Sequence, residues 1–149
     1  MSTWRELAKL DPLDVAEKIL DAHPEESDWL DEFSEALDRR RAGRSLARIL
    51  QAWGLNQSDA AKLFGVSRQA LSKWLADGVP SERVQAVADL SAATDLLIRY
   101  LKRDRIPAVV RRPAAALDGQ SLVDLIAESR TRDVLVACRS MFDFERALA

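Results

Sequence analysis

The stretch LNQSDAAKLFGVSRQALSKWL, residues 55–75, decides the fold because it carries the end signals of two short helices. Asn56 suits the N-cap of a helix over residues 57–64, since its side-chain oxygen can accept a hydrogen bond from a free N–H group of the first turn. Gly65 suits a C-cap, and Ser67 can cap a second helix with its hydroxyl. The sequence therefore predicts two helices joined by a tight turn at Gly65.

One side of the second helix carries polar side chains suited to reading DNA. Arg can donate two parallel hydrogen bonds to guanine, and Gln can both donate to and accept from adenine. The free N–H groups that open the first helix, with the Gln57 amide, suit a phosphate oxygen. The other side of the second helix is apolar and can face a core. The predicted DNA-binding residues are Gln57, Ser67, Arg68, Gln69, Ser72 and Lys73. The alternative is an ordinary helical hairpin with a solvated polar face.

Residues 54–78, GLNQSDAAKLFGVSRQALSKWLADG, resemble the helix-turn-helix of the Xre/Cro repressor family. The shared features are an Asn-Gln start, an Ala-Ala pair, a Gly-Val-Ser turn and a recognition helix ending in Trp. The resemblance implies that Gln57 contacts a phosphate, that Ala61 lies where the helices cross, and that Arg68, Gln69 and Lys73 face the bases. It also implies a helix before the motif and another after it, which residues 45–53 and 82–100 can supply.

Apolar positions recur with helical period along the whole chain and strand signals are nearly absent, so the predicted class is all-α. We expect N-terminal helices in an acidic segment (1–42), a helix-turn-helix DNA-binding bundle (43–80) and a C-terminal helical domain (81–149). Residues 1–42 hold 12 Asp and Glu against 6 Lys and Arg, whereas residues 43–112 hold 6 against 12. The positive charge thus lies where the DNA motif lies, although the whole chain has a net charge of −2.

The acidic segment predicts two helices. Asp11 can cap the first, over residues 12–22, with Pro12 at its first position. The second covers residues 25–41, after a break at His23, which is interpreted as a turn residue. The acidic run 25–32 can mimic DNA phosphate, contact a basic partner or form a solvated face. The arginines at 39–41 can follow a phosphate backbone or balance the dipole of a helix C-terminus.

In the C-terminal part, Ser121 is the expected N-cap of a helix that ends near Glu128. A last helix is expected from Thr131 or Arg132 onward, with apolar residues on more than one face. Cys138 lies within it and is interpreted as a core residue, because no residue that could activate a thiol stands near it in the sequence.

This part also resembles a family, the C-terminal domain of antitoxins of the Xre/MbcA/ParS type. The matching segments are VPSERVQAVADL, VVRRPAAALDGQSLVDLIAESR and DVLVACRSMFDF, with the spacing of Pro113, Leu117, Gly119, Ser121 and Leu125. Val109-Val110 and Leu122-Val123 depart from the usual pattern. The resemblance implies a protein that neutralises a co-expressed toxin, commonly of the NAD-consuming RES class, by covering its active site. The helix-turn-helix would repress their shared promoter.

The end of the chain suits such a partner because it combines apolar anchors with charges. The predicted toxin-binding residues are Met141, Phe142, Phe144, Glu145, Arg146 and the terminal carboxylate of Ala149. The alternative is that Phe142 and Phe144 complete the core.

Several classes of protein are disfavoured by composition. One His and one Cys, with no Gly-rich phosphate loop and no metal-spaced cluster, predict neither an enzyme nor a bound metal or cofactor. The lone cysteine, the lack of a secretion signal and the lack of a spanning apolar stretch favour a cytoplasmic protein with no membrane partner. We expect double-stranded DNA with an inverted-repeat operator, a cognate toxin, and a homodimer or higher oligomer. The alternative function is a stand-alone Xre-type repressor whose C-terminal helices only dimerise.

Overall fold

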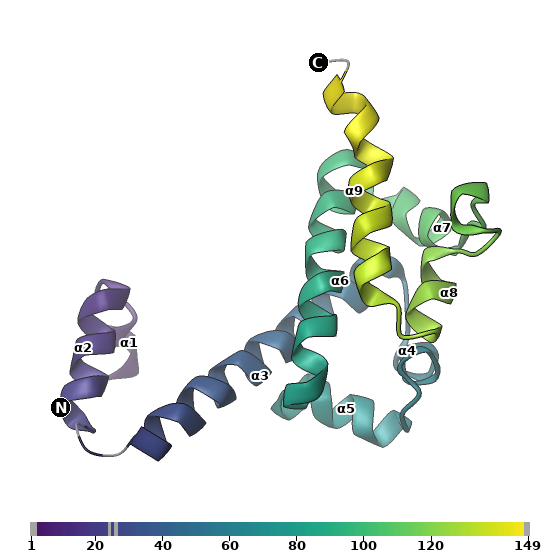
Figure 1. The fold of residues 1–149 in the computed structure, drawn as a ribbon. Helices are drawn as coiled ribbons and strands as arrows, with labels where there is room; N and C mark the ends of the chain where they lie inside the picture. The colour runs from purple at the N-terminus through teal and green to yellow at the C-terminus, as the bar shows by residue number, and fades with distance from the viewer. Residues whose placement is uncertain (1–2, 24, 26, 148–149) are drawn as a thin grey trace. The chain divides into compact units, whose positions relative to one another are not determined.

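The computed structural model describes residues 3–23, 25 and 27–147, and within these ranges it confirms the all-α class (Figure 1). The α-helices are α1 (Trp4–Leu7), α2 (Pro12–Ala22), α3 (Ser27–Trp53), α4 (Gln57–Phe64), α5 (Arg68–Asp77), α6 (Ser81–Tyr100), α7 (Ile106–Arg111), α8 (Leu122–Ala127) and α9 (Thr131–Ala147). Two 3-10 turns, η1 (Arg103–Arg105) and η2 (Ala115–Leu117), precede α7 and α8. Among the described residues, no helix has both the length and the apolar character needed to cross a membrane.

The chain divides into two compact units, residues 1–37 and residues 38–149. The first unit has none of its described side chains buried, and Leu13 of α2 is 71% exposed. The predicted helix over residues 12–22 is confirmed, with the Asp11 carboxylate accepting from the Leu13 N–H and Pro12 in the first turn. Local capping signals therefore define α2 without support from a buried core.

The predicted separation of helices 25–41 and 45–53 is wrong, because α3 runs without a break from Ser27 to Trp53. Gly43 lies inside this helix and faces the last turn of α5. A Cβ atom at Gly43 would lie 2.7 Å from the carbonyl oxygen of Trp74. The glycine thus permits a close helix contact rather than ending a helix.

The core of the 38–149 unit is one continuous apolar cluster to which α3 to α9 all contribute. α6 packs along α9, α4 packs on both α5 and α8, and α7 packs on α8. The largest fully buried side chains include Leu46, Ile49 and Trp53 of α3, Leu71 of α5, and Leu90 and Leu97 of α6. The two predicted DNA-binding helices and the C-terminal helices therefore share one core.

Three C-terminal predictions are confirmed to within about a helical turn. α6 covers the expected 82–100 range, Ser121 caps α8, and α9 begins at Thr131. Cys138 is fully buried in α9, as expected for a core residue. α7 had no counterpart in the sequence analysis. It begins in the basic stretch before Pro113 and carries Pro107 in its first turn, where proline is tolerated.

Candidate functional site

The helices α4 and α5 have the end geometry that the sequence predicts. The Asn56 side chain accepts from the Asp59 N–H at 2.8 Å, and the Ser67 hydroxyl accepts from the Ala70 N–H at 3.0 Å. Gly65 has a φ of 65°, the left-handed conformation that glycine adopts at low cost, and it ends α4. The predicted pair of helices joined at Gly65 is confirmed.

The six predicted DNA-facing residues share one property: each is exposed. They are Gln57 at the start of α4, Ser67 at the cap of α5, and Arg68, Gln69, Ser72 and Lys73 on α5. On the opposite side of α5, Leu71 has no exposed surface and Trp74 is 7% exposed. The helix is therefore held by its apolar side, and a row of donors and acceptors faces outward.

Arg83 of α6 contacts both the end of α4 and α5, a role that sequence reasoning missed. Its Nη1 atom donates to the Phe64 carbonyl oxygen at 3.1 Å, and its guanidinium lies 5.4 Å from the ring centroid of Trp74. The Phe64 and Trp74 rings meet edge to face, with centroids 6.1 Å apart. A cation stacked on a tryptophan is stabilising, so α6 braces the last turn of α4 against α5. Nothing in the sequence pattern marks Arg83 for this role.

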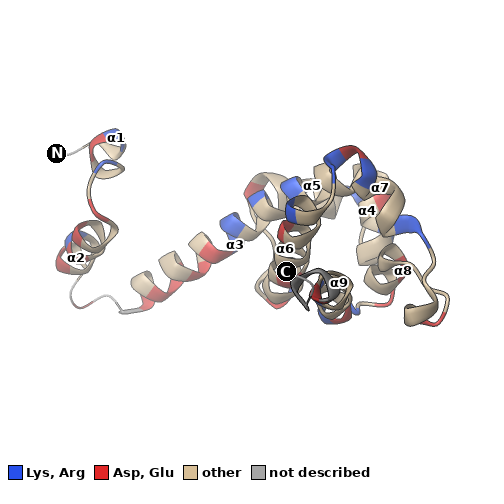
Figure 2. Ribbon diagram, turned by 90° about the horizontal axis from the view of Figure 1, so that it is seen from above, with Lys and Arg blue, Asp and Glu red and all other residues tan. Residues whose placement is uncertain are grey.

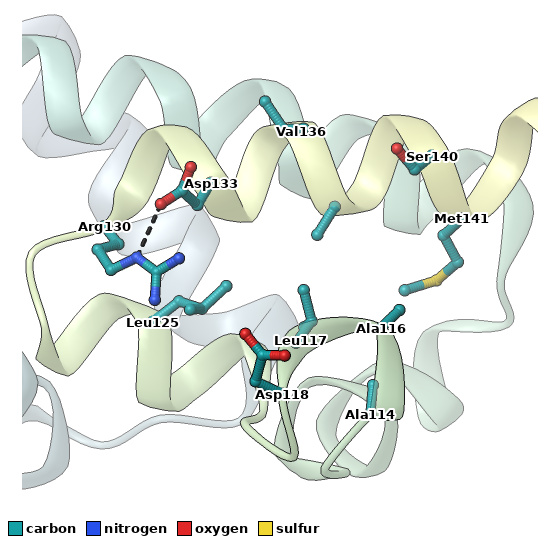
Figure 3. A pocket seen from close by; sticks show the side chains of 11 residues that line it. Ala114, Ala116, Leu117, Asp118, Leu125, Arg130, Asp133, Val136, Ser140 and Met141 are labelled. Carbon is teal, nitrogen blue, oxygen red and sulfur yellow. Dashed lines mark hydrogen bonds and ion pairs between the residues drawn. The ribbon is translucent and has the colours of Figure 1, made fainter.

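A second candidate surface is the groove between α9 and the loop that precedes α8 (Figure 3). Its volume is about 540 Å³. Leu117 and Ala116 point into it from the loop, and Met141 lies across from them on α9 (Figure 3). Met141 is 43% exposed and Val136 is 49% exposed. The groove is thus mainly apolar and open to solvent.

The loop on one side of this groove is held by its own backbone. The Ala114 N–H donates to the Gln120 carbonyl oxygen and the Gly119 N–H donates to the Ala114 carbonyl oxygen, both at 3.0 Å. Gly119 has a φ of 80°, which favours glycine there. After the loop, Ser121 and Asp124 form reciprocal backbone-to-side-chain hydrogen bonds at the start of α8. The Leu-x-Gly-x-Ser spacing therefore builds this wall of the groove.

Charged residues border the groove at the start of α9. Arg130 donates from Nε to Asp133 at 2.8 Å and pairs with Glu128 at 3.3 Å. These hydrogen bonds, first that with Asp133, hold the pKa of the Arg130 guanidinium above its ordinary value. Because the group is exposed, the pairs orient the rim more than they stabilise the fold.

The predicted toxin-binding residues have different positions. Met141 lines the groove. Phe142 is 5% exposed and stacks on Tyr100 with ring centroids 4.6 Å apart. It therefore takes the alternative role given above, as part of the core. The side chains of Phe144, Glu145 and Arg146, and the whole of Ala149, lie outside the described residues.

Comparison with known proteins identifies the family. No protein-family model matches the chain. A probable mycobacterial cidal antitoxin of Mycobacterium tuberculosis is 31% identical over 107 residues, which are 72% of this chain and 93% of that protein. The chain belongs to the mycobacterial cidal antitoxin family.

A solved structure shares the fold of this antitoxin family member. A chain in the crystal structure of the M. tuberculosis MbcT–MbcA toxin–antitoxin complex aligns with a TM-score of 0.56 and 20% identity. The alignment covers 68% of the present chain and 93% of that one. Both comparisons therefore span most of the relative and leave more than a quarter of this chain unmatched.

Proposed function

We propose that this protein neutralises a co-expressed toxin and represses the promoter that the two genes share. The observation that carries the proposal is the identity of 31% to an antitoxin over 93% of that antitoxin's length. We assign DNA binding to residues 43–80 and toxin binding to residues 81–149. Both activities would operate in the cytoplasm, without enzymatic chemistry by this chain.

We assign toxin binding to the groove of α9 and to the end of the chain. Val136 and Met141 are large apolar side chains left exposed on a helix that buries Val134, Leu135, Cys138 and Phe142, which favours a partner that covers them. The proposed partner is a toxin of the RES class, which consumes NAD, as the sequence resemblance implies. Glu145, Arg146 and the terminal carboxylate are proposed contacts to the charged mouth of its nucleotide cleft. We assign Phe142 a structural role: it packs α9 against α6 and does not itself contact the toxin.

We assign DNA binding to the exposed row on α5 together with Gln57. Arg68 opens the helix that would enter the major groove, and Gln57 lies where the free N–H groups of α4 can meet a phosphate. One such helix covers few base pairs, so the functional form is a dimer on an inverted repeat, with half-sites about 34 Å apart or a multiple of it. The same proposal makes repression and neutralisation depend on different residues.

The toxin arm is tested by co-expression with the protein encoded beside this gene, scored by growth and by co-purification. Val136→Asp combined with Met141→Asp should abolish neutralisation, because two carboxylates would enter an apolar contact. Leu13→Asp combined with Leu20→Asp makes the same chemical change at exposed positions of α2 and should leave neutralisation intact. Full neutralisation by the Val136 and Met141 variant, shown to be folded by circular dichroism, would exclude the groove.

The DNA arm is tested with a reporter driven by the promoter upstream of the gene pair. Arg68→Ala combined with Lys73→Ala should lose repression and keep neutralisation, the reverse of the groove variant. If no toxin is encoded nearby and the reporter is still repressed, the protein is a stand-alone repressor. If the reporter is not repressed by the wild-type protein, the DNA assignment is wrong.

A further inference from the structure

The arginine-rich middle of α3 lies beside the end of the proposed recognition helix. Residues 39–44 include four arginines, Arg39, Arg40, Arg41 and Arg44. One sequence-based interpretation placed the run 39–41 at a helix C-terminus, where it would balance the dipole. That interpretation is wrong, because α3 continues to Trp53. In Figure 2, acidic residues (red) dominate the first part of α3, and basic residues (blue) follow further along the helix.

Backbone contacts fasten this part of α3 to the turn that follows α5. The Val79 N–H donates to the Arg39 carbonyl oxygen at 3.0 Å, and Arg39 Nε donates to the Val79 carbonyl oxygen at 2.9 Å. A Cβ atom at Gly78 would lie 3.1 Å from the Arg39 backbone, and one at Gly43 would lie 2.7 Å from the Trp74 oxygen. The middle of α3 and the end of α5 are therefore held together at one corner of the unit. Arg39 belongs to this contact, because both its backbone and its side chain form hydrogen bonds with Val79.

Arg40 and Arg44 directly follow Arg39 and Gly43, the two residues of α3 that form this corner. They are four residues apart, so they lie one above the other on the helix surface. Both are exposed, and neither makes a hydrogen bond or ion pair with another described residue. Arg48 and Arg111, by contrast, are engaged in the fold: Arg48 pairs with Asp95, and Arg111 donates to the Trp53 and Gly54 carbonyl oxygens. Arg40 and Arg44 are therefore available to a partner.

We propose that Arg40 and Arg44 bind DNA phosphates beside the half-site that α5 reads. The inference rests on the proposed DNA-binding function and adds a backbone contact outside the motif. Phosphates are recognised by charge and carry no sequence information, so these arginines would set affinity and register rather than base preference. A guanidinium on a fixed helix suits a phosphate because its donors are held in a planar fork.

The test compares the salt dependence of DNA binding by the full chain. The probes are a duplex from the promoter upstream of the gene and a scrambled duplex of equal length. Arg40→Gln combined with Arg44→Gln should weaken binding to both duplexes by the same factor. It should also reduce the slope of log K against log salt by about 0.9 for each lost phosphate contact. Arg40→Lys combined with Arg44→Lys should retain most of the slope, since an ammonium also binds phosphate.

Arg103→Gln combined with Arg105→Gln is the matched control. Both residues are exposed on η1 and the change in net charge is the same. η1 follows the end of α6, whereas α5 precedes its start, and the 20 residues of α6 span about 30 Å. The control should keep the wild-type slope.

Three results separate the inference from the function on which it rests. An unchanged slope in the folded Arg40 and Arg44 variant overturns the inference while leaving DNA binding by α5 intact. An equal loss of slope in the control also overturns it, because net charge alone would then explain the effect. A wild-type chain that binds neither duplex refutes the proposed DNA function itself.

Discussion

Trp53 and Thr94 form a buried hydrogen bond that joins α3 to α6. The indole Nε1 of Trp53 donates to the Thr94 hydroxyl at 2.9 Å, and that hydroxyl donates to the Leu90 carbonyl oxygen at 2.7 Å. Both residues have no exposed surface. A polar pair in this position is stabilising only as long as both partners remain, because an unpaired buried donor loses its bonds to water.

Thr94→Val should therefore lower the free energy of unfolding by about 1–3 kcal/mol, since it keeps the side-chain shape and leaves the indole N–H without an acceptor. Thr94→Ser keeps the hydroxyl and removes only a methyl group, so it should cost about 1 kcal/mol. Urea denaturation followed by circular dichroism measures both. A Thr94→Val protein at least as stable as Thr94→Ser would show that the hydrogen bond contributes little.

Gly43→Ala should destabilise the protein, although alanine favours a helix over glycine by roughly 0.5–1 kcal/mol. The added Cβ would meet the Trp74 oxygen at 2.7 Å, and overpacking of this kind costs about 1–3 kcal/mol. Ser34→Ala, at an exposed position of the same helix, should change stability by less than about 0.5 kcal/mol. Thermal melts of the wild type and the two variants test this prediction. A Tm for Gly43→Ala above that of the wild type would contradict the close contact.

The parts of the fold that sequence analysis predicted well are those with local causes. Asn56, Gly65 and Ser67 each satisfy or end a helix within a few residues of their own position, so the spacing alone places α4 and α5. The exposure of Arg68 and Lys73 follows from the same spacing, because the apolar residues of α5 occupy its other side. The candidate DNA surface is thus largely readable from residues 55–75.

The errors have causes that act between distant segments. Gly43 was expected near a helix boundary, whereas its partner is the Trp74 backbone, 31 positions further along the sequence. In the sequence, nothing distinguishes Arg83 from an ordinary surface arginine, because its partners Phe64 and Trp74 lie on other helices. The sequence left open whether Phe142 binds a toxin or completes the core, because its stacking partner, Tyr100, lies on another helix. Periodicity shows that a side is apolar but not which neighbour covers it.

Because of Cys138, the free energy of unfolding should fall as pH rises in the alkaline range. Burial raises the pKa of its thiol from the ordinary 9.0 to about 12. Between pH 9 and 12 the unfolded chain releases a proton that the folded protein keeps, so the free energy of unfolding falls as pH rises. The slope for one proton is at most about 1.4 kcal/mol per pH unit. Below that window the contribution is constant.

Cys138→Ala isolates this effect, because other groups that titrate at high pH remain in both proteins. Urea denaturation at a series of pH values should show a constant difference in stability below pH 9 and a difference that shifts in favour of Cys138→Ala above it. Parallel curves throughout would show that the thiol is not kept protonated by burial.

Arg68→Ala and Gln57→Ala should impair DNA binding in different ways. An arginine that donates two hydrogen bonds to one guanine contributes about 1–3 kcal/mol of discrimination, so its loss should relax preference at one position of each half-site. A residue that contacts phosphate carries no base information, so Gln57→Ala should weaken every sequence by a similar factor. Binding to a set of single-base variants of the promoter duplex measures both effects at one salt concentration. Arg105→Ala, exposed on η1, is the control and should preserve affinity and preference. If Arg68→Ala keeps both the affinity and the base preference of the wild type, Arg68 does not read DNA. Base readout by α5 would then have to come from Gln69 and Lys73, with the helix entering the groove in a different orientation.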